Sequence, residues 1–148
     1  MLEHTSIVMA PVEAVWARVI TPEGINDEMR PWLTMSPPRG RRLTIDTVET
    51  GVPLGRCWLR LFGVLPFDFD DLMIAEVVRG RSFHETSTML SMSRWEHERT
   101  LTPAGDGATL VRDRLTFRPR IPLIARLLRP VVDAFFAHRH RRLVRHFA

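Results

Sequence analysis

The segment SRWEHERTL (residues 93–101) combines ionisable and apolar side chains in an unusual order. Because side chains alternate across a β-strand, a strand here places Trp95, His97, Arg99 and Leu101 on one face. The indole and the leucine indicate a buried face, yet that face also carries two groups able to hold positive charge. In an apolar setting such groups serve either as members of an ion-pair network or as polar anchors for a bound molecule.

The turn PAGDG predicts how this strand pairs with the next one. If Thr102 faces Ala108, the two strands form a hairpin in which opposite residues can be read from their numbers. This register places Trp95, His97 and Arg99 opposite Leu115, Asp113 and Val111, respectively.

The preceding hairpin, which turns near residues 90–92, is expected to bring Glu85 opposite His97. Glu85, His97 and Asp113 then form a row across three strands, with Arg99 one pair away. A histidine between two carboxylates tends to keep its proton. The row is interpreted either as a satisfied structural network or as the polar part of a small-molecule pocket.

The elements that must position this row follow from periodicity and turn residues. Strands are predicted over residues 2–9, 43–50, 56–62, 69–78, 82–89, 93–102 and 109–118. Helical spacing begins at Val12, and Thr21 with Pro22 starts a second short helix that ends near Met29. A long helix runs to Phe147. The expected fold class is α+β, with seven curved antiparallel strands wrapped around the C-terminal helix and two short helices after the first strand.

Length and composition narrow the class of protein. The 148 residues are expected to form one domain spanning 1–148, with 45% hydrophobic and 26% charged residues. The start MLEHTSIVMA does not predict a signal peptide, and arginines interrupt the most apolar tract, so the expected location is cytoplasmic without stable membrane insertion. Cys57 is the only cysteine. A monomer or homodimer is expected.

Other charged stretches are assigned less specific roles. The arginines of the last helix spread around its circumference, which disfavours nucleic acid as a partner. No histidine spacing supplies three or four converging ligands, so no metal and no cofactor is expected. Asp68, Asp70 and Asp71 are interpreted as a solvated strand entrance. His140 is expected to face the interior, opposite the row.

Several stretches resemble the START-like superfamily, also called SRPBCC. They are APVEAVWARV after the first strand, PWLTM after the second helix, FHETSTMLSMSRWEHERTL, GATLVRDRLTF and FFAHRHRRLVRHF, and they extend over essentially the whole chain. The resemblance implies a helix-grip fold that encloses an elongated apolar cavity. For the polyketide cyclase branch it also implies acid–base chemistry, in which His97 or Glu85 is the base and Arg99 stabilises an enolate oxygen, with Asp113 as a further catalytic candidate.

The expected function is binding, as a carrier or sensor, of a hydrophobic small molecule such as a polyketide, lipid or aromatic metabolite. The alternatives are a cyclase or dehydratase that uses the same cavity, and a protein-interaction module without an open pocket. The residues expected to contact the ligand are Phe83, Glu85, Met89, Trp95, His97, Arg99, Asp113, Leu115, Phe117, Val132, Phe136 and His140.

Overall fold

A computed structural model describes residues 1–38 and 43–148. The strands are β1 (Leu2–Val8), β2 (Leu33–Met35), β3 (Pro53–Leu61), β4 (Leu65–Val78), β5 (Ser82–Met89), β6 (Met92–Pro103) and β7 (Thr109–Pro119). The helices are α1 (Val12–Val19), α2 (Pro22–Met29) and α3 (Ala125–His146), with short 3-10 turns η2 (Ile45–Thr47) and η3 (Pro122–Ile124).

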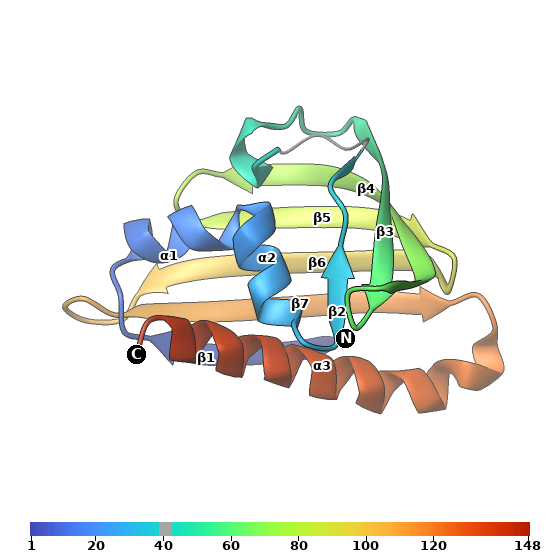
Figure 1. The fold of residues 1–148 in the computed structure, drawn as a ribbon. Coiled ribbons are helices and arrows are strands. Elements are labelled where there is room, and N and C mark those ends of the chain that lie inside the picture. Colours follow the sequence, from blue (N-terminus) through green and yellow to red (C-terminus); the bar gives the residue numbers. More distant parts are fainter. Residues whose placement is uncertain (39–42) are drawn as a thin grey trace.

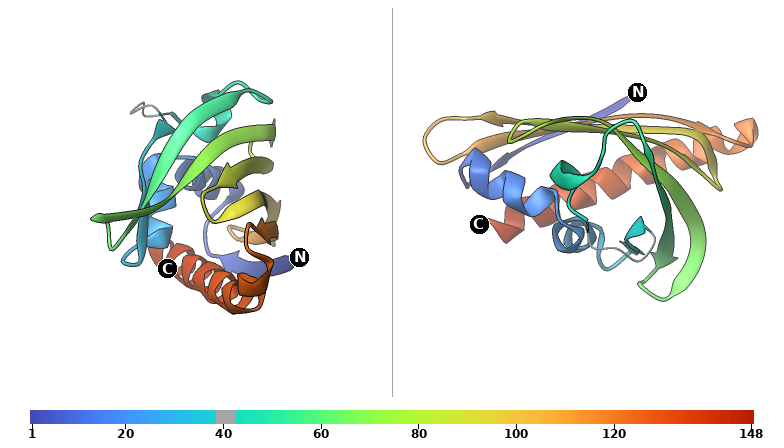
Figure 2. Two further views of the ribbon diagram at one scale, coloured as in Figure 1. Left: turned by 90° about the vertical axis from the view of Figure 1, so that its right-hand side faces the viewer. Right: turned by 90° about the horizontal axis from the view of Figure 1, so that it is seen from above.

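The strands form one antiparallel sheet in the order β1-β7-β6-β5-β4-β3-β2. The sheet curls, and α3 runs along its concave side while α1 and α2 lie across the same side (Figures 1 and 2). This arrangement confirms the predicted α+β helix-grip class, including the two short helices after the first strand.

The start of α2 follows from local chemistry. Thr21 is the N-cap, and its side-chain oxygen accepts a hydrogen bond from the backbone N–H of Gly24 at 3.0 Å, while Pro22 opens the helix. Gly24 also lies against the end of α1, where a Cβ atom would be 1.8 Å from the carbonyl oxygen of Arg18. Only glycine permits this close approach between α2 and the end of α1.

The two central hairpins test the predicted registers. Glu85 pairs with His97 as predicted. The β6–β7 register was wrong by two residues, because the strands continue to the pair Pro103–Thr109 and the turn contains Gly105 and Gly107 at positive φ. Trp95, His97 and Arg99 therefore face Phe117, Leu115 and Asp113, respectively. A shift of two keeps every side chain on its predicted face.

The prediction of a strand at residues 43–50 was wrong, and the second strand is instead the short β2. The segment holds η2, where local hydrogen bonds replace a strand ladder. The Thr44 hydroxyl donates to Asp46 at 2.7 Å, and the Thr47 hydroxyl donates to the Thr44 carbonyl at 3.0 Å. Threonine and aspartate commonly compete with regular structure in this way.

Buried apolar side chains form two clusters along the concave face. One lies beneath α1 and includes Val15, Trp16, Ile74 and Val111. The other consists of Leu59, Met89 and Met92, with Met35, Trp95, Phe117, Leu128 and Val132 packed against it. Among the helices of the described ranges, none has the length and apolar character needed to cross a membrane.

Candidate functional site

His97 lies between two carboxylates, as the sequence indicated. Its Nδ1 is 2.7 Å from Glu85 Oε1, and its Nε2 is 2.8 Å from Asp113 Oδ1. Both ring nitrogens of a protonated imidazole are donors, so the two carboxylates together match the charged form. Burial opposes this charge, but the negative charge of Asp113 and the hydrogen bonds to both acids outweigh burial and raise the pKa of His97.

Arg99 extends the row in a direction that sequence analysis did not predict. Its guanidinium donates from Nε and Nη2 to the two oxygens of Asp113, each at 2.7 Å. The same group donates from Nη1 and Nη2 to the two oxygens of Glu28, each at 2.8 Å. Arg99 and Glu28 are both only 1% exposed. Two bidentate pairs on one guanidinium are strong, geometrically specific interactions.

Glu28 is the residue that the sequence interpretation missed. It is in the last full turn of α2, four residues after the buried Gly24, so a helical-wheel reading of that helix would have placed it inward. Burial alone would raise its pKa, but Arg99 and then Arg139 hold the pKa of Glu28 below its ordinary value. Glu28 is therefore a buried carboxylate that retains its charge.

The helix α3 completes the cluster from the opposite side. Arg139 Nε donates to Glu28 Oε1 at 3.3 Å. His140 Nε2 lies 2.7 Å from Asp113 Oδ2, and His140 Nδ1 lies 2.7 Å from the Ser6 hydroxyl. His140 thus faces the row, as predicted. We call the following seven side chains the central network: Glu28, Glu85, His97, Arg99, Asp113, Arg139 and His140.

Among the six members of the central network other than His140, the charges balance. Arg99 and His97 overcome burial and hold the pKa of Asp113 well below its usual range, and the His97 hydrogen bond and charge likewise lower the pKa of Glu85. Three carboxylates then face two guanidiniums and one imidazolium. Buried ions are tolerated when they are paired and hydrogen-bonded in this manner.

The apolar candidates surround this network and pack on one another. The rings of Phe83 and Phe136 meet His97 edge-on, with centroid distances of 5.8 and 5.2 Å. Trp95 lies between Phe117 and Phe136, at 5.9 and 6.1 Å. Met89, Val132 and Leu115 fill the adjoining space.

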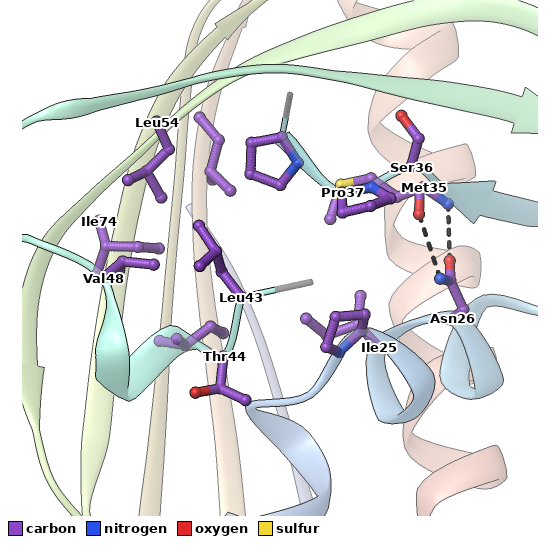
Figure 3. A pocket seen from close by; sticks show the side chains of 14 residues that line it. Ile25, Asn26, Met35, Ser36, Pro37, Leu43, Thr44, Val48, Leu54 and Ile74 are labelled. Atoms are coloured by element: carbon purple, nitrogen blue, oxygen red, sulfur yellow. Dashed lines mark hydrogen bonds between the residues drawn. The ribbon is translucent and has the colours of Figure 1, made fainter. Parts of the chain in front are cut away.

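A pocket opens elsewhere on the concave side, between α2, the segment after β2, and strands β3 and β4 (Figure 3). Almost all of its lining is apolar. The Asn26 amide, one of its few polar groups, is occupied by two hydrogen bonds with the Met35 backbone, at 3.2 and 2.7 Å. The lining side chains are Pro22, Ile25, Asn26, Met35, Ser36, Pro37, Pro38, Leu43, Thr44, Ile45, Val48, Leu54, Leu72 and Ile74.

None of the twelve residues expected to contact a ligand lines this pocket. Its volume is about 50 Å³ when measured as space open to the centre of a water molecule. One water needs roughly 10–15 Å³ on that measure, so the pocket as folded has room for a few waters. Sequence analysis missed the pocket because part of its wall, at Leu43–Val48, was interpreted as a strand.

The interpretation of Asp68, Asp70 and Asp71 of β4 as a solvated strand entrance was wrong for two of the three residues. Asp68 and Asp70 are buried and only Asp71 is partly exposed. Asp68 accepts hydrogen bonds from the Ser91 hydroxyl at 2.5 Å and from the Phe69 N–H at 2.8 Å. Burial, followed by the negative charge of Glu85, raises the pKa of Asp70 to about 7. Within the described ranges, no group of three His, Cys, Asp or Glu side chains is placed to hold a metal ion.

We expect Glu28→Gln to lower the free energy of unfolding by about 3–5 kcal/mol, since the substitution leaves Arg99 and Arg139 buried without their carboxylate. The measurement is urea unfolding at pH 6. Glu3→Gln is the control, because Glu3 is 40% exposed and accepts from Arg114 at 3.1 Å, so its loss should be below about 1 kcal/mol. Equal losses in the two variants would contradict a stabilising role for the network.

Asp70 makes the protein's stability depend on pH. Its pKa is about 7 in the folded chain and roughly 3.9 in an unfolded one, so between these values only the unfolded state releases the proton and folding stability falls as pH rises. We expect Asp70→Asn to gain stability relative to the wild type from pH 4 to pH 7 and to level off above that. The measurement is urea unfolding at intervals of one pH unit. Asp71→Asn, on the outer face, should show no such trend, and a trend of equal size there would refute the assignment.

Comparison with known proteins agrees with this geometry at the level of the fold. Similar solved structures include a START superfamily protein from Mycobacterium smegmatis (TM-score 0.70, 12% identity, covering 99% of this chain and 95% of that one). They also include Zhui aromatase/cyclase from Streptomyces sp. R1128 (TM-score 0.70, 16% identity, covering 98% of this chain and 91% of that one). A third is a conserved protein from Geobacillus kaustophilus (TM-score 0.70, 12% identity, covering 98% of this chain and 93% of that one). No curated protein matches the chain. Residues 6–147 match the model of a family described as a domain of unknown function (DUF8410), so the chain belongs to that family and has the START-like fold.

Proposed function

We propose that this protein binds a hydrophobic small molecule, as a carrier or sensor, in the interior between the curved sheet and its helices. The observation that carries the proposal is the apolar pocket at α2. Its wall combines Leu54, Leu72 and Ile74 of the sheet with Ile25 of α2. Figure 3 shows Leu54, Ile74 and Ile25 around one space. Small-molecule sites are typically concave and largely apolar, with few polar groups.

The size of the pocket limits how a ligand enters. Pockets for drug-sized ligands measure roughly 300–1,000 Å³, well above the about 50 Å³ found here. A ring-bearing ligand must therefore displace side chains such as Met35 and Leu43. Met35 also packs against the Leu59–Met89–Met92 cluster, so widening the pocket extends it toward Trp95 and the other residues predicted to contact a ligand.

We favour binding over acid–base catalysis because of the state of the central network. Both nitrogens of His97 are engaged by carboxylates, and Arg99 is engaged at every donor nitrogen by Asp113 or Glu28. A base or an oxyanion donor needs a free lone pair or a free N–H that faces the substrate. In this arrangement the ring nitrogens of His97 and the guanidinium nitrogens of Arg99 are all engaged within the protein.

Docking of a partner protein is a second candidate, favoured by exposed apolar side chains at the start of α3. Leu123 of η3 is 88% exposed, and Leu127 and Val131, which are four residues apart and so on one face of α3, are 71% and 61% exposed. An exposed stripe of this kind is unusual on a soluble surface unless it is covered by a partner. This candidate does not require the pocket to take a ligand.

The proposed binding is tested with N-phenyl-1-naphthylamine, a neutral dye that fluoresces in apolar sites. We expect saturable binding of one dye per chain, and Ile25→Trp should weaken it by at least about tenfold because the indole fills the pocket. Ile121→Trp, which adds the same group at an exposed position, is the control and should leave the affinity unchanged.

Absence of saturable dye binding to the wild type would overturn the proposal and favour the docking candidate. Equal loss of affinity in the two tryptophan variants would show that the dye does not bind at α2.

A further inference from the structure

Two polar side chains on the concave wall, Asp70 and Ser87, stand apart from the central network. The inward-facing positions of β4 include Asp68, Asp70, Leu72 and Ile74, of which the last two line the pocket. Leu72 is directly paired with Ser87 of β5. Asp70 is therefore one inward position beyond the pocket wall, and Ser87 is beside that wall.

Each of these two side chains has a buried oxygen without a hydrogen-bond partner of ordinary geometry, although both residues are more than nine-tenths buried. Asp70 is 6% exposed and Ser87 is 8% exposed, and neither Asp70 Oδ1 nor Ser87 Oγ forms a hydrogen bond of ordinary geometry with any described residue. Ser87 is near enough to favour the charged form of Asp70, without a well-formed bond between them. Leaving a buried polar atom unpaired costs roughly 1–3 kcal/mol.

The contrast with neighbouring buried acids makes this exception informative. Asp68, two residues away on the same face, is satisfied by Ser91 and by a backbone N–H. Glu28 and Asp113 are satisfied by two or more donors each. Since native interiors pair nearly all of their buried polar groups, unpaired atoms beside a pocket point to a group supplied from outside the chain.

The charges around Asp70 indicate which group would fit. The side chains that act on Asp70 electrostatically are Glu85, Asp68 and Asp71, and all three are acidic. Cys57, its partner on β3, is also held in its neutral form, because burial and then the charges of Asp70 and Glu85 raise the pKa of the thiol to about 12. This part of the interior is electronegative and offers acceptors.

We propose that Asp70 and Ser87 form the polar end of the ligand site and that they select a hydrophobic molecule bearing a protonated amine. The proposal rests on the proposed function and names its ligand class. An ammonium group carries a positive charge and three donors, which match the Asp70 carboxylate and the Ser87 hydroxyl oxygen. An alcohol offers one donor without charge, and a carboxylate offers no donor and adds repulsion.

The test compares three ligands that share one ring system: 1-naphthylmethylamine, 1-naphthylmethanol and 1-naphthoate. Calorimetric titration at pH 7.5 should give affinities in the order amine, alcohol, carboxylate, with the amine at least about tenfold tighter than the carboxylate.

Two variants locate the selectivity. Asp70→Asn keeps the side-chain shape, so it should weaken amine binding by about tenfold while alcohol binding changes by less than about threefold. Ser87→Ala should weaken the amine and the alcohol alike. Asp71→Asn is the matched control, because it removes the same charge from the adjacent outward position. The effect of Asp71 on Asp70 is the smallest of those of the three neighbouring acids, so each affinity should change by less than about threefold.

The outcomes separate this inference from the proposed function. Equal affinities of the amine and the carboxylate in the wild type would overturn the amine selectivity and leave hydrophobic binding intact, and would mean that water satisfies Asp70 and Ser87. Equal effects of Asp70→Asn and Asp71→Asn would overturn the assignment of the site. If none of the naphthyl compounds and no dye binds, both proposals fail.

Discussion

The burial of the Arg99 guanidinium is the constraint on which the rest of this fold depends. An isolated ion in an apolar interior is prohibitively costly, so Arg99 requires both Asp113 from the sheet and Glu28 from α2 at hydrogen-bonding distance. Arg139 of α3 shares Glu28, and His140 shares Asp113. The sheet and two helices therefore satisfy one another's charges, and removing Glu28 or Asp113 leaves buried cations without a carboxylate partner.

The interior holds two kinds of buried polar groups, those that are paired within the protein and those that are not. The central network is balanced and hydrogen-bonded, and its aromatic neighbours pack closely around it. Asp70 and Ser87, along the same wall, are unpaired and adjoin the pocket. Polar and ionisable residues on the apolar face of one sheet thus have different roles. They belong to the central network where the helices that cover the sheet supply their hydrogen-bond partners, and they remain unpaired where no helix does so.

Features within the sheet could be predicted from the sequence, whereas contacts between the sheet and the helices could not. Alternation along single strands placed Glu85, His97 and Asp113 on one face. The two-residue error in the β6–β7 register did not change this result, because a shift by two leaves each side chain on the same face of the sheet. The START-like resemblance and the order of elements were sufficient for the fold.

Contacts between layers were not predictable in the same way. The pairing of Glu28 with Arg99 joins residues 71 positions apart across a helix–sheet interface, and no period within either segment encodes it. The pocket was missed because apolar residues at 43 and 45 suggested a strand, whereas threonine and aspartate side chains bend that segment into η2. Asp70 was interpreted as solvated because its burial depends on the curl of the whole sheet.

The attachment of α3 is uneven along its length. Its second half is fixed by the buried contacts of Arg139 and His140, while its first half is held by the packing of Leu128 and Val132 and by the more exposed contact of Asp133 with His4. The buried ion pairs and hydrogen bonds of α3 thus lie in its second half, so we expect its first half to separate from the sheet at the lower cost in free energy. Thermal opening of the fold is then expected to begin where Leu128 and Val132 pack against the cluster that Trp95 and Phe117 also contact.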